Sequence, residues 1–526
     1  MKLKLAVFAV LVLLPACREA GAPPTPPGTP PPNGGAPAPQ VLVLKGGDFG
    51  NGGTYVELSD VGANESVAVI PLYAAQSLVP DAINYRVTAT GLTAPAAAGR
   101  DAPAARPAPS RGQKRHAAHL AHLEENRQLA LNLRRAGVKP LGQGLSPTDL
   151  GTNCPAPYTV GSTVCDFYVD PAGDATEALV NTTLRFESAN AYWFIDNSYA
   201  NEFSQAELVE LARIFEDELV PVDTGYFGNF PDADGNGKVF IVFTSLDAYG
   251  YVSYLDLFDD DEVFAQLGVH SNEGDIFYAY LPSDNVRFEQ QDNPNITEAE
   301  SRANYFDYWL PSTLVHELKH LVAGGIRLSS QTSQLEEVWA EEASAVAAEE
   351  LSPYSSSVTG YAQGQAAASL REPEKYRVIG DRDTNGDNGQ SHYGYNFLLF
   401  WRVAERVGHE NFWRTWTAGP EIGVANVEKN APALGSFADM MADWSTALMF
   451  DGTGLVSGYD YTKLDLRDGS WQPLAYSPLT GQVTGATRSL AAYVGQGTGQ
   501  DVALTIETDD PTPYAVVVRF AGSLPY

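Results

Sequence analysis

The sequence predicts a mixed α+β protein, and three observations lead to that prediction. Residues 150–455 alternate between β-type apolar runs and segments with helical periodicity. Short β-type runs separated by Gly and Asn precede this region in residues 40–97, and alternating β-type runs follow it in residues 456–526. A chain of 526 residues is also too long for one ordinary core. We therefore predict one central α+β domain with a small β-domain on either side of it.

The charge of the chain is strongly acidic and unevenly distributed. The formal net charge is −32. Residues 1–145 hold 14 Lys and Arg against 9 Asp and Glu, whereas the remaining residues hold 19 against 56. Such an acidic surface repels nucleic acid and suits a soluble, extracellular enzyme. We therefore expect no nucleic-acid partner.

Residues 1–17 have the pattern of a bacterial export signal. Met1–Lys4 is basic, and Leu5–Leu14 is an apolar run that is too short to span a bilayer. Leu14–Cys17 resembles a lipobox. We therefore predict export to the cell envelope with a lipid anchor on Cys17. The alternative is ordinary signal-peptide cleavage, followed by secretion.

Three cysteines occur in the chain, and their number favours the lipid anchor. An exported protein is expected to pair Cys154 and Cys165 in a disulfide. Cys17 is then left for the acyl chains.

Three segments are predicted between the export signal and the central domain. Residues 18–39 are dense in Pro, Gly and Ala, and such a composition is typical of a semi-rigid linker. Residues 40–97 are predicted to form the first small β-domain, with the strands Val41–Leu44, Ser66–Ile70 and Tyr85–Thr88. Residues 98–149 are predicted to contain a second linker and a helix over 116–136, which ends at Gly137.

This helix carries three histidines, His116, His119 and His122. Their spacing of three residues drifts around a helix, so the three side chains do not share one face. We therefore expect them to be solvated rather than to bind a metal.

The first part of the central domain is predicted to form a sheet covered by helices. The strand candidates are Val164–Val169, Thr183–Phe186, Ala191–Ile195 and Val239–Phe243. Ser204 and Glu207 form a capping box at the start of a helix with an apolar stripe. Ile276–Tyr280 is a further strand, which we interpret as an edge strand that pairs with the extended backbone of a substrate.

The loop Asp232–Lys238 has the oxygen spacing of a calcium-binding loop. It lacks an acidic residue at the twelfth position, so a β-turn is the favoured interpretation and Ca²⁺ is the alternative. The same two interpretations apply to Asp381–Asp387.

A helix is predicted from Pro311 to the Gly324–Gly325 pair, after a preceding helix that ends at Pro311. It contains His316, Glu317 and His320 in an H-E-x-x-H pattern. Residues four apart lie on one helix face, so the two imidazoles can bind one metal ion. Glu317 is then the predicted general base that takes a proton from a zinc-activated water.

A third ligand is needed, because catalytic zinc is held by three protein ligands and a water. The next helix offers Glu341, Glu342 and Glu349. Helical phase places Glu342 on the face of the apolar side chains Leu335, Val338, Ala345 and Val346, whereas Glu341 points about 100° away. We therefore predict Glu342 as the third ligand and Glu349, two turns later, as a residue that orients a ligand histidine.

The His316–His320 segment followed by Trp339–Ala343 resembles the glutamate zincins, whose third ligand is the Glu of a W-x-x-E-G type segment. Within this group the chain is similar to the hyicolysin family of secreted bacterial neutral metallopeptidases. Segments similar to those of the family occur at Asp232–Lys238, Ser271–Asp275 and Tyr393–Phe400. The resemblance covers residues 150–450. It implies a thermolysin-like fold, with a β-sheet lobe above the zinc helix and a helical lobe below it.

The chain departs from the pattern of these peptidases at three positions. Lys319 stands where zinc peptidases usually carry an uncharged residue, and we expect its side chain to reach solvent. Glu341 stands in place of the usual Asn, and Ala343 in place of the usual Gly.

A helix is also predicted from Ser391 to Gly408, with aromatic residues near its start. Zincins of this type place a Tyr or His of the helical lobe against the tetrahedral oxyanion, and this role is assigned to Tyr393. The alternative is that these aromatic side chains only pack the lobe.

These observations predict an exported zinc endopeptidase that acts on protein or peptide substrates. The alternative is a surface binding or adhesion lipoprotein on a degenerate peptidase scaffold. The flanking β-domains and the three departures motivate this alternative.

Overall fold

The structure is a computed structural model that describes residues 38–50, 52–74, 81–95, 111–141, 154, 156–170, 176–330, 334–379 and 393–524. The side chains of residues 111–118, 121 and 356 are not among those described. The predicted export signal with Cys17, most of the 18–39 linker and the Asp381–Asp387 loop lie outside the described residues.

The chain is a mixed α+β protein, as the sequence predicts. The α-helices are α1 (Arg111–Ala136), α2 (Gln205–Ile214), α3 (Val220–Tyr226), α4 (Asp260–Leu267), α5 (Pro282–Asp292), α6 (Glu298–Asn304), α7 (Leu310–Ser329), α8 (Val338–Leu351), α9 (Ser356–Thr359), α10 (Tyr361–Arg371), α12 (Tyr395–Val407), α13 (His409–Ala418), α14 (Gly423–Asn430) and α15 (Phe437–Phe450). Short 3-10 or π segments are η1 (Gly46–Asp48), η2 (Asn197–Tyr199), η3 (Phe215–Leu219), η4 (Tyr254–Leu257), η5 (Tyr305–Trp309), η6 (Pro373–Lys375) and η7 (Pro432–Leu434).

The strands form three sheets. They are β1 (Gln40–Lys45), β2 (Gly53–Val61), β3 (Glu65–Leu72), β4 (Ile83–Thr90), β5 (Leu92–Thr93), β6 (Val164–Val169), β7 (Ala178–Glu187), β8 (Ala191–Asp196), β9 (Val239–Phe243), β10 (Gly250–Val252), β11 (Ile276–Ala279), β12 (Ser477–Pro478), β13 (Gln482–Thr487), β14 (Tyr493–Gly497), β15 (Gln500–Thr508) and β16 (Tyr514–Ala521). The strands predicted within residues 164–243 are therefore confirmed, as is the helix predicted over 116–136.

The central part of the chain contains a mixed six-stranded sheet in the order β10-β11-β9-β8-β7-β6. Strand β9 pairs in parallel with both of its neighbours and is buried along its whole length, which explains its uninterrupted apolar run. The prediction of an edge strand at Ile276–Tyr280 was wrong, because β11 lies between β9 and β10. The strand at this edge of the sheet is the short β10.

Helix α7 is the central helix of this part, and seventeen of its twenty residues are buried. It lies against β10, β11 and α8. Pro311 does not end the preceding helix, because the π segment η5 connects α6 to α7 and the proline occupies the first turn, where it costs no hydrogen bond.

The Gly324–Gly325 pair does not end α7, which continues to Ser329. A Cβ atom at Gly324 would meet the ring of Tyr254, and one at Gly325 would meet Pro231. Both glycines therefore allow neighbouring segments to approach the helix backbone closely.

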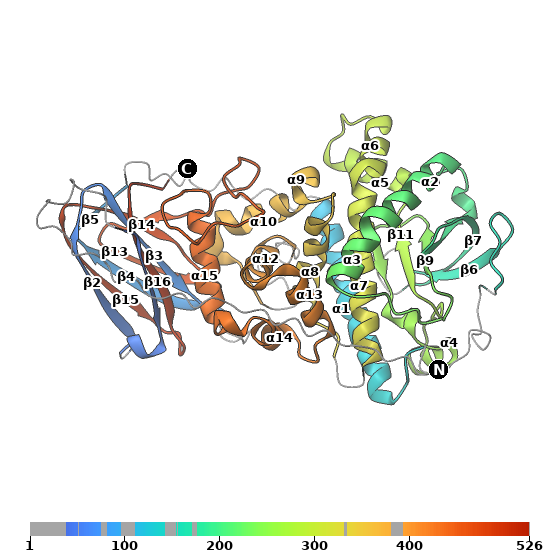
Figure 1. Cartoon of the computed structure of the whole chain (residues 1–526), viewed down its shortest axis with the longest axis horizontal. Coiled ribbons are helices and arrows are strands. Elements are labelled where there is room, and N and C mark those ends of the chain that lie inside the picture. Colours follow the sequence, from blue (N-terminus) through green and yellow to red (C-terminus); the bar gives the residue numbers. More distant parts are fainter. Residues whose placement is uncertain are drawn as a thin grey trace, which may run out of the picture. The chain divides into compact units, whose positions relative to one another are not determined.

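The flanking β-segments form two further sheets, in which strands from the N-terminal segment alternate with strands from the C-terminal segment. Strand β3 lies between β16 and β14, and β4 lies between β13 and β15, as the blue and red strands of Figure 1 show. The sequence placed residues 40–97 and 456–526 in separate β-domains, whereas their strands share the same two sheets. Alternating patterns predict strands but do not identify their partners, which is why the pairing was missed.

Strands β3 and β16 connect these sheets to the rest of the protein. Val67 and Val69 face the core between the two sheets, whereas Ala68 and Ile70 belong to the main core of the molecule. The face of this sheet that carries Ala68 and Ile70 packs against α15, where the ring centroids of Phe450 and Phe520 lie 5.0 Å apart. Strand β3 is therefore covered on both faces, and every one of its residues is buried.

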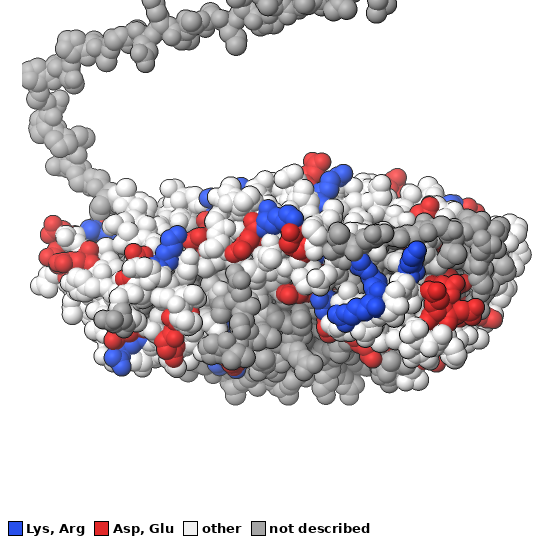
Figure 2. All heavy atoms as spheres, turned by 90° about the horizontal axis from the view of Figure 1, so that it is seen from below, with Lys and Arg blue, Asp and Glu red and all other residues white. Residues whose placement is uncertain are grey.

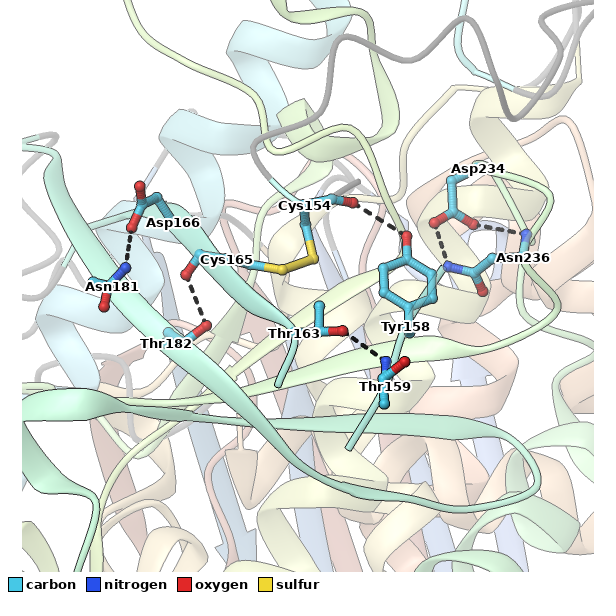
Figure 3. Close-up of a disulfide and its surroundings, with 10 residues drawn as sticks. All are labelled: Cys154, Tyr158, Thr159, Thr163, Cys165, Asp166, Asn181, Thr182, Asp234 and Asn236. Carbon is cyan, nitrogen blue, oxygen red and sulfur yellow. Dashed lines mark hydrogen bonds between the residues drawn. A yellow bond between two sulfur atoms is a disulfide. The ribbon is translucent and has the colours of Figure 1, made fainter. Parts of the chain in front are cut away.

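The predicted disulfide between Cys154 and Cys165 is present (Figure 3). It joins the segment before the central sheet to the strand β6. Tyr158 lies beside it and donates a hydrogen bond to the carbonyl oxygen of Cys154, at 3.3 Å.

The face of the protein seen in Figure 2 carries acidic and basic side chains interspersed, with a group of acidic ones near one end. In the part of the chain that the structure describes, no helix has both the length and the apolar character needed to cross a membrane.

Candidate metal centre

The H-E-x-x-H helix and the following helix bring three predicted ligands together. His316 and His320 stand one turn apart on α7, and Glu342 approaches them from α8. The Nε2 atom of His316 lies 3.3 Å from Glu342 Oε2, and that of His320 lies 3.6 Å from Glu342 Oε1. The helical phase that favoured Glu342 over Glu341 thus agrees with the geometry.

A fourth side chain joins this cluster, and the sequence analysis missed it. His119 of α1 lies with its Nε2 atom 3.5 Å from Glu342 Oε1. One ligand atom from each of His119, His316, His320 and Glu342 lies within 4.8 Å of all the others.

The expectation that the histidines of α1 are solvated was therefore wrong for two of them. The side chains of His119 and His122 are only 12% and 15% exposed. The signal was the helical phase, since His119 shares a face with the buried residues Leu123, Asn126, Ala130 and Leu133 at spacings of three and four. The side chain of His116 is not among those described.

The cluster fits a metal ion by its chemistry and by the state of its polar atoms. His320 Nε2 and both carboxylate oxygens of Glu342 are buried and have no hydrogen-bond partner among the described residues. Buried polar atoms are normally satisfied, so a group of such atoms facing one point indicates a missing partner. Imidazole nitrogen with one carboxylate oxygen is a donor set that zinc prefers.

The charges of the cluster also favour a cation. Burial raises the pKa of the Glu342 carboxyl, but the nearby His119, His316 and His320 lower it by more. The pKa of Glu342 therefore lies well below its ordinary value. Burial lowers the pKa of His316, yet Glu342 and Glu349 raise it well above the ordinary value. The buried carboxylate therefore requires nearby positive charge, either as protons on the rings or as a metal ion.

Two carboxylates contact the histidines of α7 at their Nδ1 atoms. Glu349 lies 2.7 Å from His316 Nδ1, as the sequence predicts, and it accepts a hydrogen bond from the Ser312 hydroxyl at 2.7 Å. Glu341 lies 2.9 Å from His320 Nδ1. Each contact fixes the ring and directs its Nε2 atom toward the cluster. Sequence reasoning found Glu349 but assigned no role to Glu341.

Lys319 does not reach solvent, because its side chain is completely buried. Its Nζ atom lies 2.7 Å from Glu341 Oε1 and 5.2 Å from the centre of the Trp416 ring. Burial raises the pKa of Glu341, but Lys319 and His320 lower it to about 2. The two charged departures from the peptidase pattern, Lys319 and Glu341, are thus one buried ion pair.

The two predicted catalytic residues lie beside the cluster. Glu317 is 3% exposed, and its Oε2 atom has no hydrogen-bond partner among the described residues. The ring of Tyr393 stacks near that of His316 with centroids 6.1 Å apart. Burial, with the charge of Glu342, raises the pKa of the Tyr393 hydroxyl well above its ordinary value, so it stays a proton donor.

A second group of acidic side chains lies at the Asp232–Lys238 loop. Carboxylate oxygens of Asp232, Asp234 and Asp275 lie within 4.8 Å of one another. Asp275 comes from the segment before β11, so sequence spacing within the loop could not indicate it.

No protein-family model matches this chain, and no curated protein matches it. The likeness to glutamate zincins therefore rests on the motif residues themselves.

Lys319→Met is expected to lower the free energy of unfolding by about 3 kcal/mol, because it leaves the Glu341 charge buried without its main partner. The double variant Lys319→Met/Glu341→Gln is expected to regain most of that loss, since no unpaired charge remains. Urea unfolding followed by circular dichroism measures both. The pairing is contradicted if Lys319→Met lowers stability equally in the wild type and in the Glu341→Gln background.

Proposed function

We propose that this chain is a zinc endopeptidase of the glutamate zincin type, similar to the hyicolysin family and with a thermolysin-like catalytic domain. One observation carries the proposal. His316, His320 and Glu342 converge from two helices on one buried point, and Glu317 of the same H-E-x-x-H motif stands beside them. This combination of three ligands and an adjacent carboxylate is the arrangement that metal-assisted peptide hydrolysis requires.

In this proposal His316, His320 and Glu342 hold zinc, and Glu349 and Glu341 keep the two rings in place. When bound, zinc supplies a Lewis acid that polarises the peptide carbonyl and acidifies a water molecule. Glu317 accepts the proton of that water and delivers it to the leaving amine. Tyr393 donates a hydrogen bond to the oxyanion that develops on the carbonyl oxygen.

The substrate in this proposal is an extended stretch of a protein or peptide. The short edge strand β10 stands next to α7, which carries the H-E-x-x-H motif. An edge strand offers backbone donors and acceptors to any extended peptide, so it binds substrates without demanding particular side chains. We assign this role to β10 in place of β11.

The competing function is binding or adhesion on a peptidase scaffold without activity. The shared β-sheets favour it, because two-sheet domains of this kind often serve as binding modules. The Lys319–Glu341 pair is an argument against the adhesion proposal, because two of the three departures from the peptidase pattern compensate one another. Zinc bound without casein hydrolysis would favour the adhesion proposal.

We also propose that the protein is exported and held in the cell envelope by lipid on Cys17, with secretion as the alternative. The support is the sequence of residues 1–17, which lie outside the described residues. Cys17→Ser is expected to move the protein from the membrane fraction to the soluble fraction. Unchanged fractionation would favour the ordinary signal peptide.

Glu317→Gln is expected to keep the bound zinc and to lower the rate of casein hydrolysis by roughly 10²- to 10⁴-fold, because the ligands remain and the general base is lost. Glu298→Gln, at an exposed position of α6, is the matched control and should behave as the wild type. Zinc content and chelator-sensitive hydrolysis are measured on the same preparations. Loss of zinc together with activity in the Glu317 variant would assign Glu317 a structural role instead.

A further inference from the structure

We infer that helix α1 is an inhibitory segment of this protein and that its His119 is a fourth protein ligand, which closes the metal site. The inference rests on the proposed function and adds a regulatory state to it. Two separate contacts of α1 support it, one at the metal cluster and one at the edge strand.

The first contact is the position of His119 within the ligand cluster. Its Nε2 atom lies 3.5 Å from Glu342 Oε1, and its ring centre lies 6.4 Å from that of His316. Catalytic zinc sites use three protein ligands and keep the fourth position for water or substrate, whereas sites with four protein ligands are closed. With His119 in place, the protein itself supplies a complete tetrahedral set.

The second contact involves Asn126, two turns further along α1. Its side-chain amide donates a hydrogen bond to the carbonyl oxygen of Val252 at 2.9 Å and accepts one from the backbone N–H of Tyr254 at 2.9 Å. Val252 is the last residue of the edge strand β10, and Tyr254 is the first residue of the following segment η4. A carboxamide has the same donor and acceptor as a peptide unit, so Asn126 satisfies the backbone groups that an extended substrate would use.

Several buried contacts hold α1 in this position. Leu123, Ala130 and Leu133 belong to the main core. Arg134 donates a hydrogen bond to the carbonyl oxygen of Ser330 at 2.8 Å, just beyond the end of α7. Helix α1 is therefore docked firmly, and peptide hydrolysis requires that it first be displaced.

The test uses the cobalt-substituted full-length protein with acetohydroxamate as a probe of an open coordination position. The visible absorption of the wild-type cobalt protein is expected to change little when the probe is added. His119→Ala is expected to show a clear spectral change and a rise in casein hydrolysis of roughly 10-fold or more, because an internal competitor has been removed. Glu125→Ala, at an exposed position of the same helix, should resemble the wild type.

Asn126→Ala provides a second variant, which weakens the docking of α1 and leaves every ligand in place. It is expected to show a partial response to the probe. Equal responses of the wild type and the His119 and Asn126 variants would overturn the inhibitory role of α1 and leave the proposed function intact. Cobalt binding that survives Glu342→Ala in the His119→Ala background, where only two histidine ligands remain, would instead overturn the proposed metal site itself.

A different observation supports a second site, and we propose that Asp232, Asp234 and Asp275 bind one Ca²⁺ ion. Asp275 is completely buried, and its Oδ1 atom has no hydrogen-bond partner among the described residues. Asp234 is also buried, and Figure 3 shows it with Asn236 beside Tyr158 and the disulfide. Buried carboxylates are normally paired with a cation, and a group of three carboxylates suits a hard divalent ion.

Thermal unfolding of the zinc-saturated protein in CaCl₂ tests this second site. The wild type is expected to show a Tm that rises and saturates with Ca²⁺, whereas Asp275→Asn and the more exposed Asp232→Asn lose most of that rise. Asp256→Asn removes another buried carboxylate and should keep the Ca²⁺ response. A wild-type Tm that Ca²⁺ leaves unchanged would overturn the proposal, as would an undiminished rise in both cluster variants.

Discussion

The burial of the Glu342 carboxylate among imidazoles is the constraint on which the centre of this structure depends. A carboxylate taken out of water without positive charge costs several kcal/mol, and His119, His316 and His320 all lie close to it. This requirement brings α1, α7 and α8 to one point. The glycines of α7 permit the close approach of neighbouring segments, and Glu341 and Glu349 hold the two rings of α7 in their orientation.

Charge compensation extends beyond the four side chains of the cluster. Lys319 and Glu341 neutralise one another in a fully buried pair, and Glu341 also contacts His320. Glu341 and Glu342 therefore each have basic neighbours, and His320 contacts both carboxylates. Lys319, inside the H-E-x-x-H pattern of α7, is tolerated because α8 carries Glu341 as its partner.

Sequence reasoning succeeded where the determining interactions are local. The β9 run, the Ser204 capping box and the phase that separates Glu342 from Glu341 all depend on neighbours within a few turns or strands. It failed where a residue depends on a distant partner. Nothing near Lys319 in the sequence indicates that Glu341 will neutralise it, and the Cβ contacts that require Gly324 come from Tyr254 in another element. His119 combines both situations. Its helical phase could have predicted that it is buried, but nothing near it in the sequence identifies its distant partner Glu342.

The most direct test of the central claim is the metal content of the His119→Ala protein and of two adjacent glutamate variants made in it, measured by mass spectrometry after zinc loading and dialysis. The account predicts about one zinc per chain in His119→Ala, which keeps three protein ligands, and little when Glu342→Ala is added, because only two histidines then remain. It predicts a content close to that of His119→Ala at saturation when Glu341→Ala is added instead, with an affinity lowered by roughly 10- to 100-fold through the loosened His320 ring. Zinc lost from the Glu341 variant and kept by the Glu342 variant would contradict the account.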